Sequence, residues 1–386
     1  MPRPDEPLVE SVCVGSPREV GRAQGESLRA KVRQSVGLLR ELEAFRLPQP
    51  RWAPYPAYRW LAEGKSARFL AAALRDRPGP REQLAGLAEG AGVPPRTLAL
   101  LNALEPLLSS VGGCTACPAA CSAVAVRGRR SADGAPMIAR NFDYLPLVQP
   151  LYTVRERRPA GGLRSLEFTT APLVGAVDGV NEAGLCVAYD YAYATDVPPA
   201  PAGPISFAIA EVLSHCRTVA EAAERFAATP RWGGGLLMLA DAGGEIGSLE
   251  LSSGRCRLRR PAEGEDLLFH SNAFADPHLR EVQIADDAVY TDAAPTALRG
   301  RPLHQSSGRR DARFRELLAG DEAFDADGLN AVMADHGPDG VPAVDTICVH
   351  GPYWNTTACL QFFPRERRLR ASYSSACAAA FRDAAL

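Results

Sequence analysis

The sequence predicts an α+β protein in which helices cover antiparallel sheets, and three observations lead to that class. Residues 1–120 are mostly helical in pattern, and strand-like segments joined by short turns begin at about residue 121. Helices then return between blocks of strands. Strands that follow one another through short turns pair antiparallel, and helices inserted between such blocks favour layers of helix on sheet. We therefore expect a helical segment over 1–120 that packs on a core over 121–386.

The helices of the first segment are predicted from apolar residues at helical spacing. A capping box with proline at the first helical position, Ser16-Pro17-Arg18-Glu19, opens a long amphipathic helix over about 17–45. A second helix is expected over 59–75 and a third through Leu84 to Ala88. Pro94-Pro95 end it, and a fourth helix runs from Thr97 to Leu108.

The core begins with a hairpin. Strands over 122–126 and 136–144 flank a polar turn. The later elements are predicted in chain order: strands over 151–158, 163–170, 172–180 and 185–193; helices over 205–216 and 219–228; strands over 236–240 and 245–252 and one ending at Phe269-His270-Ser271-Asn272; helices near 309–319 and 327–334; and strands over 345–350, 356–363 and 368–374.

Charge and composition exclude several classes of protein. Among 386 residues, 43 Lys and Arg oppose 45 Asp and Glu, for a net charge of -2. This balance gives no reason to expect nucleic acid or a membrane as a partner. No apolar run approaches the roughly 18 residues of a membrane span, and the polar start has no secretory core. We therefore expect a cytoplasmic protein.

Metal and cofactor motifs are not found in the sequence. It has no phosphate-binding glycine motif, and its six histidines are scattered, none paired at i, i+4. Cys114 and Cys117 form a CxxC pair with no second pair to complete a zinc set, although a thiol-redox role stays open. We expect no metal and no cofactor.

Cys121 is the most promising reactive residue because of its position. It begins the first strand of the hairpin, and the return strand ends with Arg140 and Asp143. A tight hairpin would bring the three side chains together. A guanidinium beside a thiol favours the nucleophilic thiolate, and a carboxylate could orient an amine. A lone cysteine is more often a small buried apolar residue, so the pattern alone leaves both interpretations open.

Seven segments, in order, resemble one enzyme family: Gly15–Gly21, Leu84–Gly90 with Leu101-Asn102, Cys121-Ser122 with Asp133-Gly134 and Arg140–Asp143, Val180–Leu185, Leu239–Glu250, His270–Asn272, and Asp345–Arg368. The chain resembles the N-terminal-nucleophile (Ntn) hydrolases of the penicillin (isopenicillin N) acyltransferase type, with choloylglycine hydrolases as more distant relatives. The resemblance implies a four-layer αββα sandwich of two stacked antiparallel sheets, with residues 121–386 as the Ntn core.

The resemblance also implies a mechanism. The precursor is cut between Ala120 and Cys121, and the α- and β-chains stay together. Cys121 is then the nucleophile, and its freed α-amine, with an ordinary pKa near 7.7–8.0, is the general base. Asp143 holds that amine, Arg140 supports the nucleophile, and Asn272 donates a hydrogen bond to the oxyanion.

The implied reaction acts on linear amide C–N bonds through a cysteine acyl-enzyme. The enzyme is an amidohydrolase, an acyl-CoA:amine N-acyltransferase, or both, and its partner is a small amide or acyl donor, with acyl-CoA one candidate. An unprocessed, non-catalytic binding or scaffold protein of the same fold is the alternative. It is kept open by Ala120, where the acyltransferase has glycine, and by a longer hairpin.

The remaining candidates concern a rival nucleophile and the pocket. Gly113-Cys114-Thr115 also resembles the family's Gly-Cys-Thr, but it would leave Pro118 where the strand should run. Arg310 matches an arginine at a helix start. Asp190 and Tyr191 lie where choloylglycine hydrolases carry an asparagine. Three aromatic residues could line an acyl pocket, although residues of this kind near strand ends more often belong to the core: Tyr144, Tyr191 and Trp354. Three histidines are more simply interpreted as packed, hydrogen-bonded residues than as catalysts: His270, His336 and His350.

Overall fold

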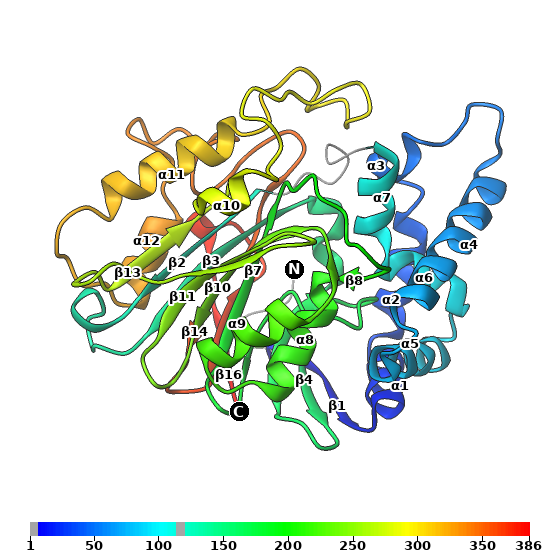
Figure 1. The fold of residues 1–386 in the computed structure, drawn as a ribbon, viewed down its shortest axis with the longest axis horizontal. Helices are drawn as coiled ribbons and strands as arrows, with labels where there is room; N and C mark the ends of the chain where they lie inside the picture. Colours follow the sequence, from blue (N-terminus) through cyan, green and yellow to red (C-terminus); the bar gives the residue numbers. More distant parts are fainter. Residues whose placement is uncertain (1–6, 113–119) are drawn as a thin grey trace.

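Four layers make up the molecule, as Figure 1 shows for this computed structural model, which describes residues 7–112 and 120–386. Helices α8 (Ile205–His215) and α9 (Val219–Ala228) pack on an eight-stranded sheet. A six-stranded sheet stacks against its other face, and α11 (Gln305–Leu317) and α12 (Ala326–Met333) cover that second sheet. The predicted αββα sandwich is confirmed.

Both sheets are almost wholly antiparallel. The eight-stranded sheet has the order β1 (Val9–Gly15), β4 (Tyr152–Pro159), β5 (Ser165–Thr170), β6 (Asp178–Asn181), β7 (Cys186–Ala192), β10 (Gly234–Ala240), β11 (Ile246–Leu251), β12 (Cys256–Arg259). The six-stranded sheet has the order β13 (Leu267–His270), β2 (Ala120–Val126), β3 (Met137–Tyr144), β14 (Asn355–Phe363), β15 (Arg368–Ser372), β16 (Arg382–Ala385). The one exception among the described strands of these two sheets is β1, which pairs parallel with β4 at the sheet edge.

The hairpin strand β2 shows how the sequence separates the layers. Cys121, Ala123 and Ala125 face the space between the two sheets. Val124 and Val126 face the opposite way, toward α11 and α12. Side chains alternate between faces along a strand, and because all seven residues of β2 are buried, both faces are apolar.

The N-terminal helices pack beside the sandwich around a second apolar cluster, which also contains Ala171, Val174 and Phe207 of the sandwich. In Figure 1 they are the blue and cyan helices: α1 (Pro17–Ser27), α2 (Arg29–Leu38), α3 (Glu43–Arg46), α4 (Tyr55–Ala73), α5 (Pro78–Ala91), α6 (Pro95–Asn102) and α7 (Leu104–Gly112). α1 and α5 touch backbone to backbone, since a Cβ on Gly21 would lie 2.0 Å from the Gln83 carbonyl oxygen.

The predicted helix over 17–45 is wrong in its continuity. The chain leaves helical geometry at Leu28, where φ is -104° and ψ is 19°. The hydroxyl of Ser27 bonds back to the Ala23 carbonyl at 2.8 Å and lies 2.6 Å from the Ser11 hydroxyl on β1. Such side-chain bonds to the preceding turn bend helices. The N-terminal segment over 1–120 also contains β1, a strand that the helical pattern did not predict.

Two predicted strands differ as well. Residues 345–350 form turns rather than a strand, because the Thr346 hydroxyl bonds to the carbonyls of Ala343 and Cys348. The strand expected over 172–180 is reduced to β6. Short elements complete the described chain: β8 (Gly203–Pro204), β9 (Arg231–Trp232), α10 (Pro277–Arg280), and the 3₁₀ turns η2 (Gly128–Arg130), η3 (Pro146–Leu151) and η4 (Ala376–Ala378). No helix within 7–112 or 120–386 is long and apolar enough to cross a membrane.

Candidate active site

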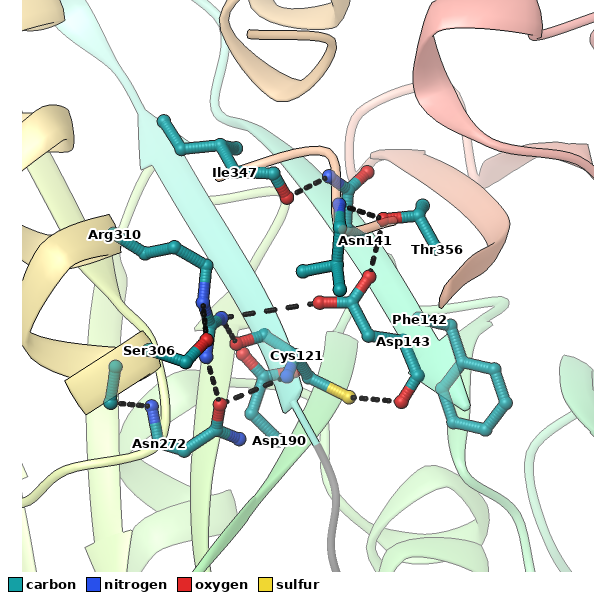
Figure 2. A network of polar contacts seen from close by, with 12 residues as sticks. Cys121, Asn141, Phe142, Asp143, Asp190, Asn272, Ser306, Arg310, Ile347 and Thr356 are labelled. Atoms are coloured by element: carbon teal, nitrogen blue, oxygen red, sulfur yellow. Dashed lines mark hydrogen bonds and ion pairs between the residues drawn. The ribbon is translucent and has the colours of Figure 1, made fainter. Parts of the chain in front are cut away.

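The hairpin of β2 and β3 brings the three sequence-predicted residues together. Cys121 pairs with Phe142, so Ala120 lies opposite Asp143. The Cys121 Sγ lies 3.5 Å from Arg140 Nη2 and 3.9 Å from the Asp143 carbonyl oxygen, as Figure 2 shows for the second contact. All three residues are buried. The predicted contact of Arg140 with the thiol is therefore present, whereas Asp143 contacts the thiol through its main-chain carbonyl only.

Arg140 is clamped by two carboxylates between the sheets. Its Nη1 donates to Asp178 Oδ2 at 2.6 Å and its Nε to Asp190 Oδ1 at 3.0 Å, and its Nη2 donates to the Tyr189 carbonyl. Burial raises the pKa of Asp178 to about 7 against the attraction of Arg140. Sequence analysis missed Asp178. A charged residue inside an apolar predicted strand was the available signal, because such groups are seldom buried unless paired.

The thiol of Cys121 is held in its neutral form. Burial raises its pKa well above the ordinary value, and the nearby Arg140 is the largest opposing influence. The expectation that the arginine favours thiolate is right in direction, but desolvation is the larger effect. A base must therefore take the thiol proton before Cys121 can attack a carbonyl.

The backbone nitrogen of Cys121 is held by Asn272. The Cys121 N–H donates to Asn272 Oδ1 at 2.9 Å, and Arg310 Nη2 donates to the same oxygen at 2.7 Å (Figure 2). Two donors on one atom fix the orientation of this amide. Its Nδ2 donates to the Tyr191 carbonyl at 2.8 Å. The amide oxygen thus occupies the place beside the nitrogen where the resemblance implied Asp143.

Asp143 lies next to this group and keeps one oxygen unpaired. Its Oδ1 accepts a hydrogen bond from the Thr356 hydroxyl at 2.6 Å. Its buried Oδ2 has no hydrogen-bond partner among the described residues and lies 4.0 Å from Arg310 Nη1. Burial raises the pKa of Asp143 to about 8, while Arg310 and Thr356 act to lower it. Thr356 was not singled out from the sequence.

Arg310 lies in the second turn of α11, not at the helix start that the resemblance implied, and it contacts both Cys121 and Asn272. It is 1% exposed, and its Nη1 donates to the Cys121 carbonyl oxygen. His270 belongs to the structural surroundings, as expected: its Nδ1 lies 2.8 Å from the Ser248 hydroxyl and its Nε2 3.4 Å from Asp190 Oδ2. The rival nucleophile Cys114, like Cys117, lies outside the described residues.

An apolar cavity of about 210 Å³ opens beside the thiol. Cys121 and Arg140 lie on its wall with Tyr144 and Tyr191, whereas Trp354 packs against Tyr290 instead. Leucine is the commonest residue on the wall, and most of these leucines come from the N-terminal segment and from η3, among them Leu38, Leu39, Leu42, Leu104, Leu108 and Leu147.

Glu105, also on the wall, is partly buried, and desolvation of its carboxyl group raises its pKa to about 7. A carboxyl group with that pKa carries little charge below neutral pH. The cavity therefore suits an apolar group.

Two stacked sheets between helical layers, with a buried polar site at the end of a central strand, define the Ntn class of amidohydrolases and acyltransferases. The chain belongs to the acyl-coenzyme A:6-aminopenicillanic acid acyl-transferase family, whose model matches residues 129–324. The match contains Arg140, Asp143, Asn272 and Arg310 and begins after Cys121.

Similar solved structures share 14% sequence identity with this chain. An N-acylethanolamine-hydrolyzing acid amidase ortholog from Caenorhabditis elegans has a TM-score of 0.42, covering 63% of this chain and 93% of its own. A mutant of the conjugated bile acid hydrolase from Clostridium perfringens has a TM-score of 0.38, with 66% and 89% covered. Penicillin V acylase from Agrobacterium tumefaciens has a TM-score of 0.38, with 65% and 82% covered. No curated protein matches the chain.

Proposed function

We propose that the chain cuts itself between Ala120 and Cys121 and then cleaves linear amides with an apolar acyl group through a thioester on Cys121. One observation carries the proposal: the thiol, the nitrogen of the same residue and the apolar cavity meet at a single buried point. The family of the chain supports amide or acyl-transfer chemistry at that point.

Self-cleavage would use the Cys121 side chain on its own peptide bond. The sulfur attacks the Ala120 carbonyl, the thiol proton passes to the peptide nitrogen, the C–N bond breaks, and the nitrogen leaves as the α-amine of Cys121. Water then hydrolyses the Ala120 thioester and regenerates the thiol. Arg310 and Asn272 hold the carbonyl and the nitrogen of Cys121, so this residue would stay in place as the chain is cut.

The freed amine would then be the base that the buried thiol requires. A model α-amine has a pKa of about 7.7–8.0, so it accepts a proton near neutral pH. The resulting thiolate, beside Arg140, attacks the substrate carbonyl and forms the acyl-enzyme, and the ammonium returns the proton to the leaving amine. Asp143 Oδ2, which accepts no hydrogen bond from the described residues, is suited to hold that ammonium.

Asn272 would stabilise the oxyanion formed in self-cleavage and the oxyanion formed in amide cleavage. Its oxygen faces the Cys121 nitrogen, and its Nδ2 uses one hydrogen on the Tyr191 carbonyl, which leaves a second hydrogen for an oxyanion. A donor of this kind contributes about 3 kcal/mol to a transition state.

The last step sets the choice between hydrolysis and transfer. Water attacking the thioester completes amide hydrolysis, whereas an amine completes N-acyl transfer from an acyl donor such as acyl-CoA. The description of the matched family favours transfer as the second candidate. In both reactions the leucine-lined cavity would take the acyl group.

The test combines variants of Cys121 with a series of acyl-chain lengths. Purified protein is assayed on N-acyl amines with short and long chains, and on the matching acyl-CoA plus an amine. We expect Cys121→Ala to reduce either activity by at least about 10⁴-fold, with longer chains preferred by the wild type. Cys256→Ser, a partly buried cysteine outside the site, should stay fully active.

Two results would contradict the proposal. If Cys121→Ala kept wild-type activity, Cys121 would not be the nucleophile. If the wild type turned over neither substrate class, the unprocessed binding or scaffold alternative would replace the enzyme.

A further inference from the structure

Four potential metal ligands from three separate segments converge at the far side of the six-stranded sheet. His336 follows α12, Cys348 and His350 lie in the loop before β14, and Cys377 belongs to η4. One ligand atom of each residue lies within 4.8 Å of the other three. The cysteines are free thiols, one buried and one exposed.

The spacing of these atoms matches a tetrahedral zinc site. His350 Nε2 lies 3.5 Å from Cys348 Sγ and 3.5 Å from Cys377 Sγ. With Zn–S near 2.3 Å and Zn–N near 2.0–2.1 Å, the nitrogen and sulfur ligands of a tetrahedral ion lie about 3.5 Å apart. The two imidazole rings have centroids 5.1 Å apart and an interplanar angle of 73°, so they do not stack face to face.

Ordinary hydrogen bonds leave this cluster poorly satisfied. A neutral imidazole nitrogen without hydrogen has one lone pair, yet two thiols share His350 Nε2. His336 Nε2 is buried and has no hydrogen-bond partner among the described residues. A buried polar atom without a partner costs free energy, and a bound cation would remove that cost for the whole cluster.

We propose that His336, Cys348, His350 and Cys377 bind one Zn²⁺ ion in a closed, structural site. Binding releases the two thiol protons, so the two thiolates balance the charge of the ion. Exposed Cys377 gives the metal a route from solvent. The sequence expectation of no metal rested on local motifs, whereas these ligands come from three separate segments of the chain.

The ion would anchor the loop that supports the candidate active site. Between Cys348 and His350, the Val349 N–H donates to the Thr356 hydroxyl at 2.8 Å, and that hydroxyl donates to Asp143. The Ile347 carbonyl accepts from Asn141 on β3, as Figure 2 shows. These four zinc ligands would thus be positioning residues for Asp143, acting through Thr356.

The test is the metal content of the full chain, produced without a polyhistidine tag. After loading with Zn²⁺ and gel filtration, elemental analysis should give about one Zn²⁺ per chain, falling at least about tenfold in Cys377→Ser and in His336→Ala. Cys256→Ser and His278→Ala are the matched controls outside the cluster and should keep the ion. Co²⁺ in place of Zn²⁺ should give tetrahedral ligand-field bands and a sulfur-to-cobalt charge-transfer band, which only a thiolate site produces.

Three outcomes would overturn the site: no zinc retained by the wild type, unchanged zinc in Cys377→Ser, or a Cys348–Cys377 disulfide found by peptide mass mapping. Because Cys377 is exposed, its replacement leaves the core intact and the result interpretable. The zinc content can also be measured in Cys121→Ala, so the test of the zinc site does not depend on the proposed amidase activity.

Discussion

The polar side chains buried on the two faces of strand β3 find their partners in different ways. Arg140 faces the eight-stranded sheet and is neutralised there by Asp178 and Asp190, which lie on strands. Asn141 faces α12 and binds the carbonyls of Met333 and Ile347, which lie in a helix and a loop. The inner face is thus fixed by strand register, whereas the outer face depends on loops. The outer face also holds one buried pair of charged groups, Asp143 and Arg310 of α11, whose nearest atoms lie 4.0 Å apart.

The largest loss of stability is expected from a substitution on the inner face. Arg140→Leu would leave Asp178 and Asp190 buried without a cation. Removing one partner of a buried ion pair costs about 3–5 kcal/mol, so we expect a loss of that size in the free energy of unfolding, measured with urea. Adding Asp190→Asn should recover part of it. A loss below about 1 kcal/mol, with no recovery, would show that the clamp contributes little.

The outer face should respond less strongly. Asn141→Leu removes two hydrogen bonds that Nδ2 donates, of 2.8 and 3.0 Å, and one that Oδ1 accepts from the Cys359 thiol at 3.3 Å, and it leaves two carbonyls unsatisfied. We expect a loss of about 2 kcal/mol in the same urea measurement. Combined with Asp190→Asn on the inner face, the effects should add within about 0.5 kcal/mol, because the side chains share no partner. Strong coupling would contradict the separation of the two faces.

Asp143, which lies on the same face of β3 as Asn141, should make the stability of the protein depend on pH. Burial raises its pKa to about 8, above its unfolded value near 3.9. Between these values the folded state binds more protons, so stability should fall as pH rises from about 4 to about 8.

The measurement compares Cys121→Ala with Cys121→Ala/Asp143→Asn, so that neither chain is cut. Urea unfolding across that pH range should give a slope that is smaller in the double variant, by at least about 1 kcal/mol over the range. Equal slopes would mean that Asp143 does not carry this raised pKa.

The smallest effect concerns selectivity. Leu147→Trp narrows the cavity on the inner face, so kcat/KM for long acyl chains should fall about tenfold relative to short ones. Leu317→Trp, at a partly buried position at the end of α11 on the opposite side of the six-stranded sheet, is the matched control and should not shift chain-length preference. An unchanged preference in Leu147→Trp would place the acyl group elsewhere.

Local sequence signals predicted the hairpin and hence the contact of Cys121 with Arg140. Resemblance added Asn272 and Arg310, which come from remote segments. Asp178 and Thr356 were missed because their importance arises only when β6 and β14 pack beside β3. The loop over 345–350 was assigned as a strand because its β-branched residues favour strands, while side-chain bonds of Thr346 hold it in turns.

The most direct test of the central claim is the intact mass of freshly purified protein, with N-terminal sequencing of each fragment. Cleavage before Cys121 predicts pieces of about 13 and about 28 kDa, the larger beginning Cys-Ser-Ala-Val. A fragment beginning Cys-Thr-Ala-Cys would instead place the nucleophile at Cys114. An active preparation that stays a single chain of 41.2 kDa would contradict the account.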